Sequence, residues 1–276
     1  MSPSSDGNTP SCERQVSATP EEAARGLAGC LVAHLRRRLT EAPDAHLALS
    51  GGSSAALLGA ALAREDGLST EDWARIHVWL VDERCVPADD SRLNFNLLKD
   101  VLLGRVALPA ENLHPMPVQD PTGAARYEAE LRSAFMARTN PEDRRLDAVV
   151  LGMGPDGHTA SLFPGTPALA ERERLVVLND GDKVVPPRPR MTMTFPILNR
   201  ARLIALLVTG AAKRPALARA WSNEANADAV PVAGIVPAPG SRLVWFLDQE
   251  AVPKADFCVQ MDDESTTPVS GRPRIS

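Results

Sequence analysis

The sequence predicts an open, mostly parallel, doubly wound α/β sheet with helices on both faces. Two observations lead to this prediction. Short apolar runs have the composition of buried strands, and helical segments lie between many of them. The runs are 46–50, 76–81, 146–151, 174–178, 191–195, 202–208 and 242–248. Alternation of strands and helices favours parallel pairing with helices over both faces, so the expected architecture is Rossmann-like.

Length and composition limit the class of protein. The chain has 276 residues, 44% of them apolar, and a net charge of −5. This composition is ordinary for a globular protein with a substantial core. Because there is no basic surplus, we expect neither nucleic acid nor an anionic membrane as a partner. Any anionic substrate must then be held by a local group of cations.

The cysteines indicate a reducing compartment. Cys12, Cys30, Cys85 and Cys258 are scattered and lack CxxC spacing, which argues against zinc ribbons and disulfide frameworks. No apolar run approaches the length of a membrane span, and the polar N-terminus lacks the apolar region of a signal peptide. We therefore expect a cytoplasmic protein without a metal site, monomeric or alternatively dimeric.

Two polar segments flank the patterned part of the chain. Residues 1–19 are rich in Ser, Pro, Gly, Asn and Thr, and residues 254–276 have a similar character. Such segments bury too little apolar surface to fold alone. We expect both to be disordered tails around a single α/β domain over residues 20–253.

Sequence signals for helices occur at three places in the domain. Thr19-Pro20-Glu21-Glu22 combines an N-cap, a proline in the first turn and acidic residues, and predicts a helix to about Leu39. Residues 121–138 form a further predicted helix, and Asp89-Asp90-Ser91 is a candidate cap for a helix that begins near Asn94. The helix over 121–138 should bury the side chains at i, i+4 and i+8, which are Tyr127, Leu131 and Phe135.

Two strand ends lead through glycine turns into helices. Gly51-Gly52-Ser53 follows the run 46–50, and Thr209-Gly210 follows the run 202–208 and precedes Lys213. The N-terminus of a helix after such a turn offers unpaired N–H groups to an anion. Lys213 would oppose the helix dipole, which favours an anionic partner near it. Neither turn has the Gly-Lys-Ser/Thr ending of a Walker loop.

A run of charged residues, Asp82-Glu83-Arg84, ends the apolar run 76–81. Three consecutive charges at the carboxyl end of a strand are hard to explain by packing. Loops at such positions commonly carry function. We therefore expect a site there, with a solvated loop as the alternative.

The most informative stretch is the turn after Leu146–Leu151, which reads Gly152-Met153-Gly154-Pro155-Asp156-Gly157-His158. Glycines permit close backbone approach, and His158 can transfer protons near neutral pH. A tight turn with a solvated histidine is the alternative. The stretch also matches GxGxxG, with Asp180 at the distance of a ribose-binding acid. However, Pro155 removes a backbone donor, and prolines at 164 and 167 interrupt the helix that a dinucleotide site requires.

At this point the chain resembles a known family. The stretch from Leu151 to Gly165 resembles the hallmark motif of the 6-phosphogluconolactonases, which share a fold with glucosamine-6-phosphate deaminases. Four further segments agree in order and spacing, and the resemblance covers about residues 20–252. These segments are Leu49–Ser53, Val81–Pro87, Arg190–Thr194 and Val208–Lys213.

The resemblance implies hydrolysis of 6-phospho-D-glucono-1,5-lactone to 6-phospho-D-gluconate, the second step of the oxidative pentose phosphate pathway, without metal or cofactor. It implies His158 as general base and Asp156 as the residue that orients it or shapes the turn. Substrate-binding residues are expected at Gly51, Gly52, Ser53, Asp82, Arg84, Arg190 and Lys213. Arg190 is preferred to Arg188 as a phosphate ligand because it aligns with the family's Thr-Met-Thr strand.

Two alternatives remain open. Deaminases of this fold continue into a segment ending Asn-Glu-Pro, whose Glu supports the histidine, whereas this chain has Ser161-Leu162-Phe163-Pro164. The family's serine before Asn94 is replaced by Leu93, so Asn94 is carried over only weakly. A non-catalytic sugar-phosphate sensor is the second alternative, and the intact His158 argues against it.

Overall fold

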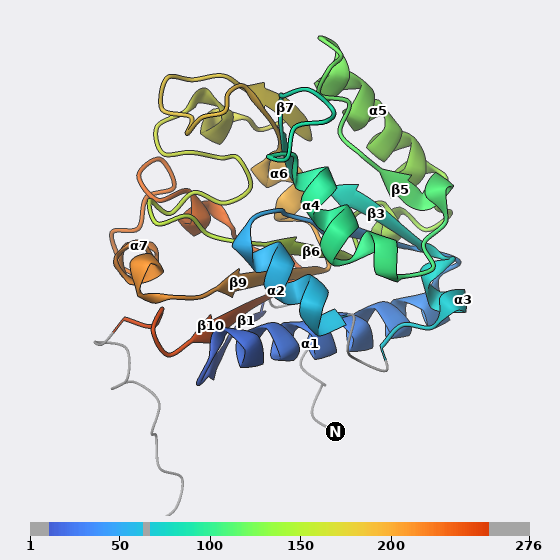
Figure 1. The fold of residues 1–276 in the computed structure, drawn as a ribbon, viewed down its shortest axis with the longest axis horizontal. Coiled ribbons are helices and arrows are strands. Elements are labelled where there is room, and N and C mark those ends of the chain that lie inside the picture. Colours follow the sequence, from blue (N-terminus) through green and yellow to red (C-terminus); the bar gives the residue numbers. More distant parts are fainter. Residues whose placement is uncertain (1–10, 63–66, 254–276) are drawn as a thin grey trace, which may run out of the picture.

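The computed structural model describes residues 11–62 and 67–253, and its main sheet has seven strands in the order β1-β10-β9-β6-β2-β3-β5. All of its pairings are parallel, which confirms the expected Rossmann-like α/β fold (Figure 1). The strands are β1 (Ser11–Ser17), β2 (Ala45–Leu49), β3 (Ile76–Leu80), β5 (Leu113–His114), β6 (Ala148–Leu151), β9 (Leu203–Val208) and β10 (Arg242–Asp248).

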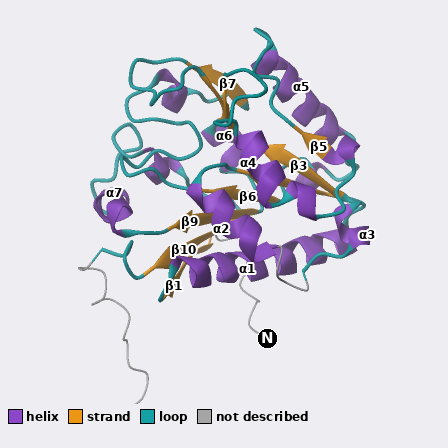
Figure 2. Ribbon diagram, in the orientation of Figure 1, coloured by secondary structure: helices purple, strands orange, loops and turns teal. Residues whose placement is uncertain are grey.

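Helices cover both faces of this sheet (Figure 2). On β10, Phe246 lies against Gly26 of α1, whereas the adjacent Trp245 contacts Trp221 at the end of α7. Neighbouring strand residues point to opposite faces, so α1 and α7 lie on opposite sides, and α2 packs beside α1. The helices are α1 (Pro20–Glu41), α2 (Ser53–Leu62), α3 (Thr70–Trp73), α4 (Asn94–Val101), α5 (Gly123–Met136), α6 (Phe195–Leu198) and α7 (Arg214–Ala220).

Short 3₁₀ helices connect several of these elements. They are η1 (Leu103–Arg105), η2 (Ala110–Asn112), η3 (Pro141–Asp143), η4 (Pro167–Ala170), η5 (Ala211–Lys213) and η6 (Pro231–Gly234). None of the helices that the structure describes is both long and apolar enough to cross a membrane.

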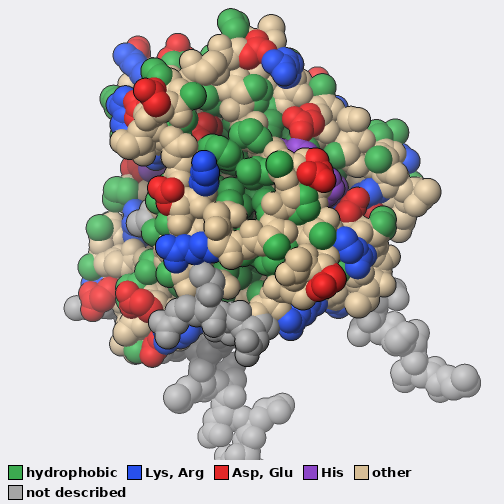
Figure 3. All heavy atoms as spheres, turned by 45° about the vertical axis from the view of Figure 1, so that its right-hand side comes forward, with side chains coloured by type: hydrophobic (Ala, Val, Ile, Leu, Met, Phe, Trp, Pro, Cys, Tyr) green, Lys and Arg blue, Asp and Glu red, His purple; other side chains and the backbone are tan. Residues whose placement is uncertain are grey.

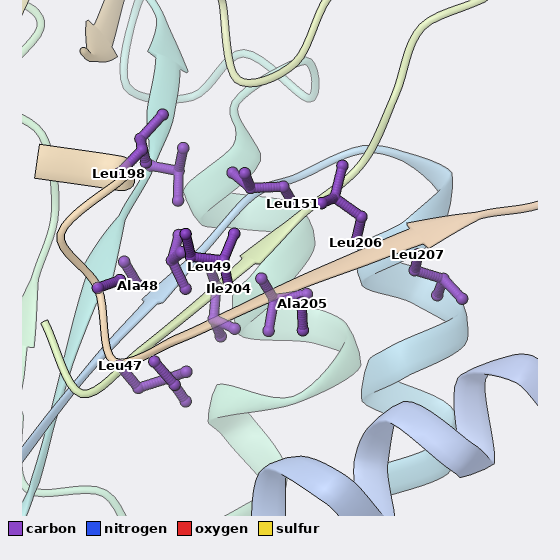
Figure 4. Packing of buried hydrophobic residues seen from close by; sticks show 14 of the residues in the cluster. Leu47, Ala48, Leu49, Leu151, Leu198, Ile204, Ala205, Leu206 and Leu207 are labelled. Atoms are coloured by element: carbon purple, nitrogen blue, oxygen red, sulfur yellow. The ribbon is translucent and has the colours of Figure 1, made fainter. Parts of the chain in front are cut away.

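The core lies around the central strands β2, β6 and β9, whose residues are all buried. Figure 4 shows how Leu47 and Leu49 of β2, Leu151 of β6 and Leu206 of β9 pack there. Burial on both faces explains why these strands are continuous apolar runs rather than alternating ones. The prediction for α5 is also confirmed, because Tyr127, Leu131 and Phe135 are buried.

The first helix begins as expected. The Thr19 side chain accepts a hydrogen bond from the backbone N–H of Glu22 at 3.2 Å, and Pro20 opens the first turn. Capping of this kind stabilises a helix by about 1 kcal/mol. The predicted end near Leu39 falls two residues before the observed end at Glu41.

The expectation of a disordered segment over residues 1–19 is wrong for Ser11–Ser17, which form the edge strand β1. Its stabilising partners lie more than 200 residues away. Glu13 forms a bidentate ion pair with Arg242, and the Arg14 guanidinium lies 3.7 Å from the ring centroid of Trp221. Because these contacts are long-range and polar, local composition could not reveal them. Residues 1–10 and 254–276 lie outside the described residues, and the single domain expected over 20–253 stays a prediction.

Three further strands form a second, smaller sheet, which was not predicted from the sequence. β4 (Asp82–Arg84), β8 (Arg190–Met193) and β7 (Val176–Asn179) form a small antiparallel sheet in the order β4-β8-β7. A proline-rich loop, not a helix, connects β7 to β8, and parallel pairing requires a longer crossover connection. The predicted strand over 191–195 ends at Met193, because Phe195 begins α6.

Surface charge is mixed on the face drawn in Figure 3. Basic and acidic side chains lie beside one another there, with apolar side chains between them. Such a mixture is ordinary for a globular protein, whose accessible surface is largely apolar.

Candidate active site

The candidate site lies where the order of the strands reverses. From β2 the chain continues to β3 and β5 on one side, whereas β6, β9 and β10 follow on the other side. Open α/β sheets bind ligands at such a switch point, outside the carboxyl ends of the strands. Gly51 follows β2 and Gly152 follows β6, so both glycine turns lie at this crevice.

A cavity of about 340 Å³ opens there. Seven of the nine predicted site residues line it: Gly51, Gly52, Asp82, Arg84, His158, Arg190 and Lys213. Asp156 lies behind His158 and not in the lining. Ser53 begins α2, and its side chain lies outside the described part of the structure. The structure thus brings together residues from segments more than 160 positions apart.

The turn after β6 is built around the imidazole of His158. The backbone N–H of Gly154 donates to the carbonyl of His158 at 2.8 Å, and the N–H of Gly157 donates to the carbonyl of Gly154 at 3.0 Å. Gly157 has a φ of 89°, a conformation that favours glycine. A Cβ at Gly154 would lie only 2.1 Å from His158 Nδ1. Gly154 therefore makes room for the imidazole.

Asp156 is the hydrogen-bond partner of Nδ1 of His158. Its Oδ1 lies 2.6 Å from Nδ1 of His158 and also accepts the backbone N–H of His158 at 3.2 Å. An ionised carboxylate can only accept, so the proton resides on Nδ1 and Nε2 keeps its lone pair. Burial raises the pKa of Asp156, but the hydrogen bond and charge of His158 lower it by more, to below its ordinary value of 3.8. Asp156 is thus ionised at neutral pH.

Three cations, Arg84, Arg190 and Lys213, line the cavity together with His158. Arg190 is nearly fully buried, and its guanidinium donates to the carbonyls of Pro187 at 2.6 Å and Val185 at 3.0 Å. Burial, and next the charge of Arg84, lower the pKa of Arg190. Burial also lowers the pKa of Lys213, and the charge of Asp156 opposes that shift. Both cations are thus held partly out of water, and Arg190 also lies beside the charge of Arg84, so an anionic ligand would be stabilised there.

Phe163 contacts both halves of the site. Its ring centroid lies 4.5 Å from that of His158 and 5.8 Å from the guanidinium carbon of Arg190. Arg188 pairs instead with Asp182 at 2.9 Å and does not line the cavity. Phe163 was not among the predicted site residues, although it lies in the hallmark stretch.

Asp82 connects the small sheet to the loop after His158. Its carboxylate is buried and accepts the hydroxyl proton of Ser161 at 2.6 Å, while its backbone carbonyl accepts from Asn94 Nδ2 at 2.8 Å. Asn94 and Ser161 also line the cavity. The sequence indicated Asn94 only weakly, and nothing in the local pattern distinguished Ser161 as a partner of Asp82.

Glu83 has a structural role. Its buried carboxylate accepts the backbone N–H groups of Arg84, Asn94 and Phe95 at 2.7–2.8 Å. Burial raises its pKa, and these three bonds oppose the shift. The last two N–H groups belong to the first turn of α4, so Glu83 caps this helix. The expected capping by Asp89-Asp90-Ser91 is wrong, since α4 begins after Leu93 without a local side-chain cap.

The arrangement is typical of enzymes that act on small anionic substrates: an oriented imidazole faces several cations across a small polar cavity at the switch point of an α/β sheet. The chain belongs to the family described as glucosamine-6-phosphate isomerases/6-phosphogluconolactonase, whose model matches residues 18–245.

Similar proteins agree with this assignment. The chain is 40% identical over 246 residues to the GDH/6PGL endoplasmic bifunctional protein of Oryctolagus cuniculus, covering 86% of this chain and 29% of that protein. The chain therefore spans less than a third of the length of this relative. It is 38% identical over 225 residues to the 6-phosphogluconolactonase of Synechocystis sp., covering 80% of this chain and 89% of the relative.

Solved structures show the same fold. The 6-phosphogluconolactonase of Thermotoga maritima matches with a TM-score of 0.71 and 28% identity, over 86% of this chain and all of that one. A monomeric glucosamine-6-phosphate deaminase matches with a TM-score of 0.69 at 20% identity, over 87% of this chain and 98% of that one. The latter similarity concerns the fold alone.

Proposed function

We propose that the protein hydrolyses 6-phospho-D-glucono-1,5-lactone to 6-phospho-D-gluconate, with His158 as general base. The observation that supports this proposal is the 2.6 Å contact between Asp156 and Nδ1 of His158. It leaves Nε2 as a proton acceptor in a cavity that also contains Arg84, Arg190 and Lys213. We infer the substrate from the names of the relatives and the mechanism from the residues that line the cavity.

The reaction needs one base and charge stabilisation. His158 Nε2 takes a proton from water while the water oxygen bonds to C1 of the lactone. The carbonyl π electrons move onto its oxygen, and Asp156 stabilises the imidazolium that forms. When the carbonyl reforms, the bond between C1 and the ring oxygen breaks. The imidazolium returns its proton to the ring oxygen, which becomes the C5 hydroxyl of the acid.

The cations divide between the two ends of the substrate. Arg190, Lys213 and the N-terminus of α2 at Gly51-Gly52-Ser53 hold the phosphate, because guanidinium, ammonium and helix N–H groups are its preferred partners. Arg84 is assigned to the same phosphate cradle. Its alternative role is to donate to the oxyanion, for which the N–H groups of the turn after β6 are the other candidate donors. Asp82 accepts from a substrate hydroxyl or orients Ser161.

Lactone hydrolysis fits this site better than deamination does. Among the described residues, Asp156 is the carboxylate bonded to His158, and the following loop presents Ser161 and Phe163 where deaminases carry a glutamate. Amine release and ring-opening isomerisation would require that second acid/base group. Hydrolysis of an activated ester does not.

The decisive assay must exceed spontaneous opening of the lactone. Glucose-6-phosphate dehydrogenase generates the lactone in situ, and its disappearance is followed with and without the protein. We expect acceleration by the wild type and its near-complete loss in His158→Ala, with substrate binding retained. No acceleration by the wild type refutes the activity, and unchanged turnover in His158→Ala refutes the base. Release of ammonia from glucosamine 6-phosphate would instead identify a deaminase.

Two matched variants test the phosphate cradle. Arg190→Ala and Lys213→Ala should raise KM more than they lower kcat, whereas Arg188→Ala, which removes a guanidinium outside the cavity, should change neither. An unaltered KM in both cradle variants would contradict the assignment. A cytoplasmic location and a monomeric state remain predictions.

A further inference from the structure

A second hollow, of about 350 Å³, lies far from the candidate active site and shares no lining residue with it. Arg144 and Arg145 precede β6, and Arg200 precedes β9, so the hollow lies near the amino ends of these strands. The active site lies at their carboxyl ends. Arg132 of α5 completes a rim of four arginines.

Positive charge on this rim is poorly neutralised. Arg132 pairs with Glu128 at 2.7 Å, but Arg144, Arg145 and Arg200 form no ion pair within the described ranges 11–62 and 67–253. Arg144 and Arg145 donate only their Nε–H groups, to backbone carbonyls at 3.3 and 3.1 Å. Burial, followed by the charge of Arg202, lowers the pKa of Arg145; the charge of Arg200 adds to this shift, and those of Glu142 and Asp143 oppose it. Cations crowded in this way favour binding of a further anion among them.

The remaining lining of the hollow is apolar. Phe135 and Ile197 are buried beneath it, Leu175 and Pro196 are partly buried, and Met136 is 62% exposed at its edge. Exposed methionines adapt their shape to apolar ligands. An apolar surface with a guanidinium rim matches a ligand that has both an apolar body and an anionic group.

The hollow adjoins another one. A neighbouring hollow of about 730 Å³ shares four lining residues with it: Arg132, Leu175, Pro196 and Arg200. The two together form one groove. We call it the arginine groove.

We propose that the arginine groove binds a small amphipathic anion, with its apolar group over Phe135 and Ile197 and its phosphate or carboxylate between Arg145 and Arg200. Nucleotides and carboxylates with an aromatic or aliphatic body share this chemistry. The ligand acts at a site separate from lactone hydrolysis, because the arginine groove has no residue in common with the catalytic cavity.

The test uses the full chain and the fluorescent aromatic sulfonate 8-anilinonaphthalene-1-sulfonate as probe. We expect one saturable site whose affinity falls about tenfold in Arg200→Gln, the loss of one charge-assisted hydrogen bond. Met136→Glu, which places an acid at the exposed edge, should weaken binding similarly. The control is Arg105→Gln, which removes an exposed arginine of η1 that has no ion pair among the described residues and should bind as the wild type.

Competition identifies the ligand class. Displacement by ATP supports a nucleotide, and displacement by octanoate supports an aliphatic carboxylate, whereas saturating 6-phosphogluconate should displace nothing. All three variants should hydrolyse lactone at the wild-type rate, so that failure of the arginine groove is separable from failure of the proposed activity.

Several results would overturn the proposal. They are absence of saturable binding, equal affinity in wild type and both groove variants, and displacement by 6-phosphogluconate, which would place the probe in the active site. Equal displacement by inorganic phosphate and by ATP would show that the apolar part of the arginine groove does not contribute to binding. A dimer that dissociates on Met136→Glu would show that a second copy covers the arginine groove.

Discussion

Replacement of Asp156 by asparagine tests the proposed base most directly. The amide keeps the size of the carboxylate, and its oxygen can still accept the backbone N–H of His158. Turned the other way, it presents an NH₂ group to Nδ1 and favours the proton on Nε2, where it prevents base catalysis. Since Asp156 does not line the cavity, the substitution should lower kcat and leave KM nearly unchanged.

The magnitude follows from the geometry. A hydrogen bond to a charged group contributes about 1.5–3 kcal/mol. The Asp156 side chain is 37% exposed, so solvent screens part of this, and about 1–2 kcal/mol remains for the transition state. At about 1.4 kcal/mol per factor of ten, kcat should fall about 5- to 30-fold.

The pH dependence adds a second test of the same variant. The pKa of Asp156 lies below its ordinary 3.8, so the ionised carboxylate that bonds Nδ1 of His158 is present above that value and is lost only as the pH falls through the lowered pKa. The deficit of Asp156→Asn should therefore be constant across the neutral range.

The assay is initial-rate lactone hydrolysis, with Asp180→Asn as control because it removes an exposed carboxylate outside the cavity. Wild-type kcat in Asp156→Asn would refute the orienting role of Asp156. A raised KM at unchanged kcat would make Asp156 a substrate ligand instead.

Three further predictions concern other parts of the molecule. Gly154→Ala should lower kcat at least about 100-fold by displacing the imidazole of His158, whereas Gly29→Ala on α1, whose Cβ would meet nothing within 4 Å, should leave the rate unchanged. Glu83→Gln should lower the free energy of unfolding in urea by about 2–3 kcal/mol, because its NH₂ group cannot accept the α4 N–H that bonds one of the two carboxylate oxygens; an unchanged midpoint would contradict the cap. Burial lowers the pKa of His34 from 6.5 to about 4, so the unfolded chain binds its proton first, and stability should fall by about 3 kcal/mol as the pH drops from 6.5 to 4. His34→Gln should remove that part of the acid sensitivity, and an identical pH profile would show that another group causes it.

The sequence predicted those features that depend on neighbouring residues. The cap at Thr19, the apolar strands β2, β6 and β9, and the buried face of α5 with Tyr127 are all determined within a few positions of the chain. Periodicity and capping therefore sufficed for them. The same holds for the turn that carries Asp156 and His158, whose contact is between residues two positions apart.

Contacts between distant residues could not be predicted in this way. β1 depends on the ion pair between Glu13 and Arg242. The cap of α4 depends on Glu83, which lies in β4 and accepts the N–H groups of the first turn of the helix. The contact between Asp82 and Ser161 requires the small antiparallel sheet, and the hydrophobic periodicity of the sequence does not predict that sheet. Each is a polar interaction whose partner is at least eleven residues away, and such pairs carry no signal in composition or periodicity.

The glycines after β6 show why a motif must be interpreted through its contacts. As GxGxxG, Gly152, Gly154 and Gly157 would bring backbone close to a pyrophosphate. Here a Cβ at these positions would lie 2.9 Å from Ser54 Oγ, 2.1 Å from His158 Nδ1 and 2.6 Å from Val230 Cγ1. All three spaces are filled by the protein's own side chains, and the middle one by the imidazole itself. Gly154 hence makes room for His158, whereas the cations of the cavity, Arg84, Arg190 and Lys213, lie on other segments of the chain.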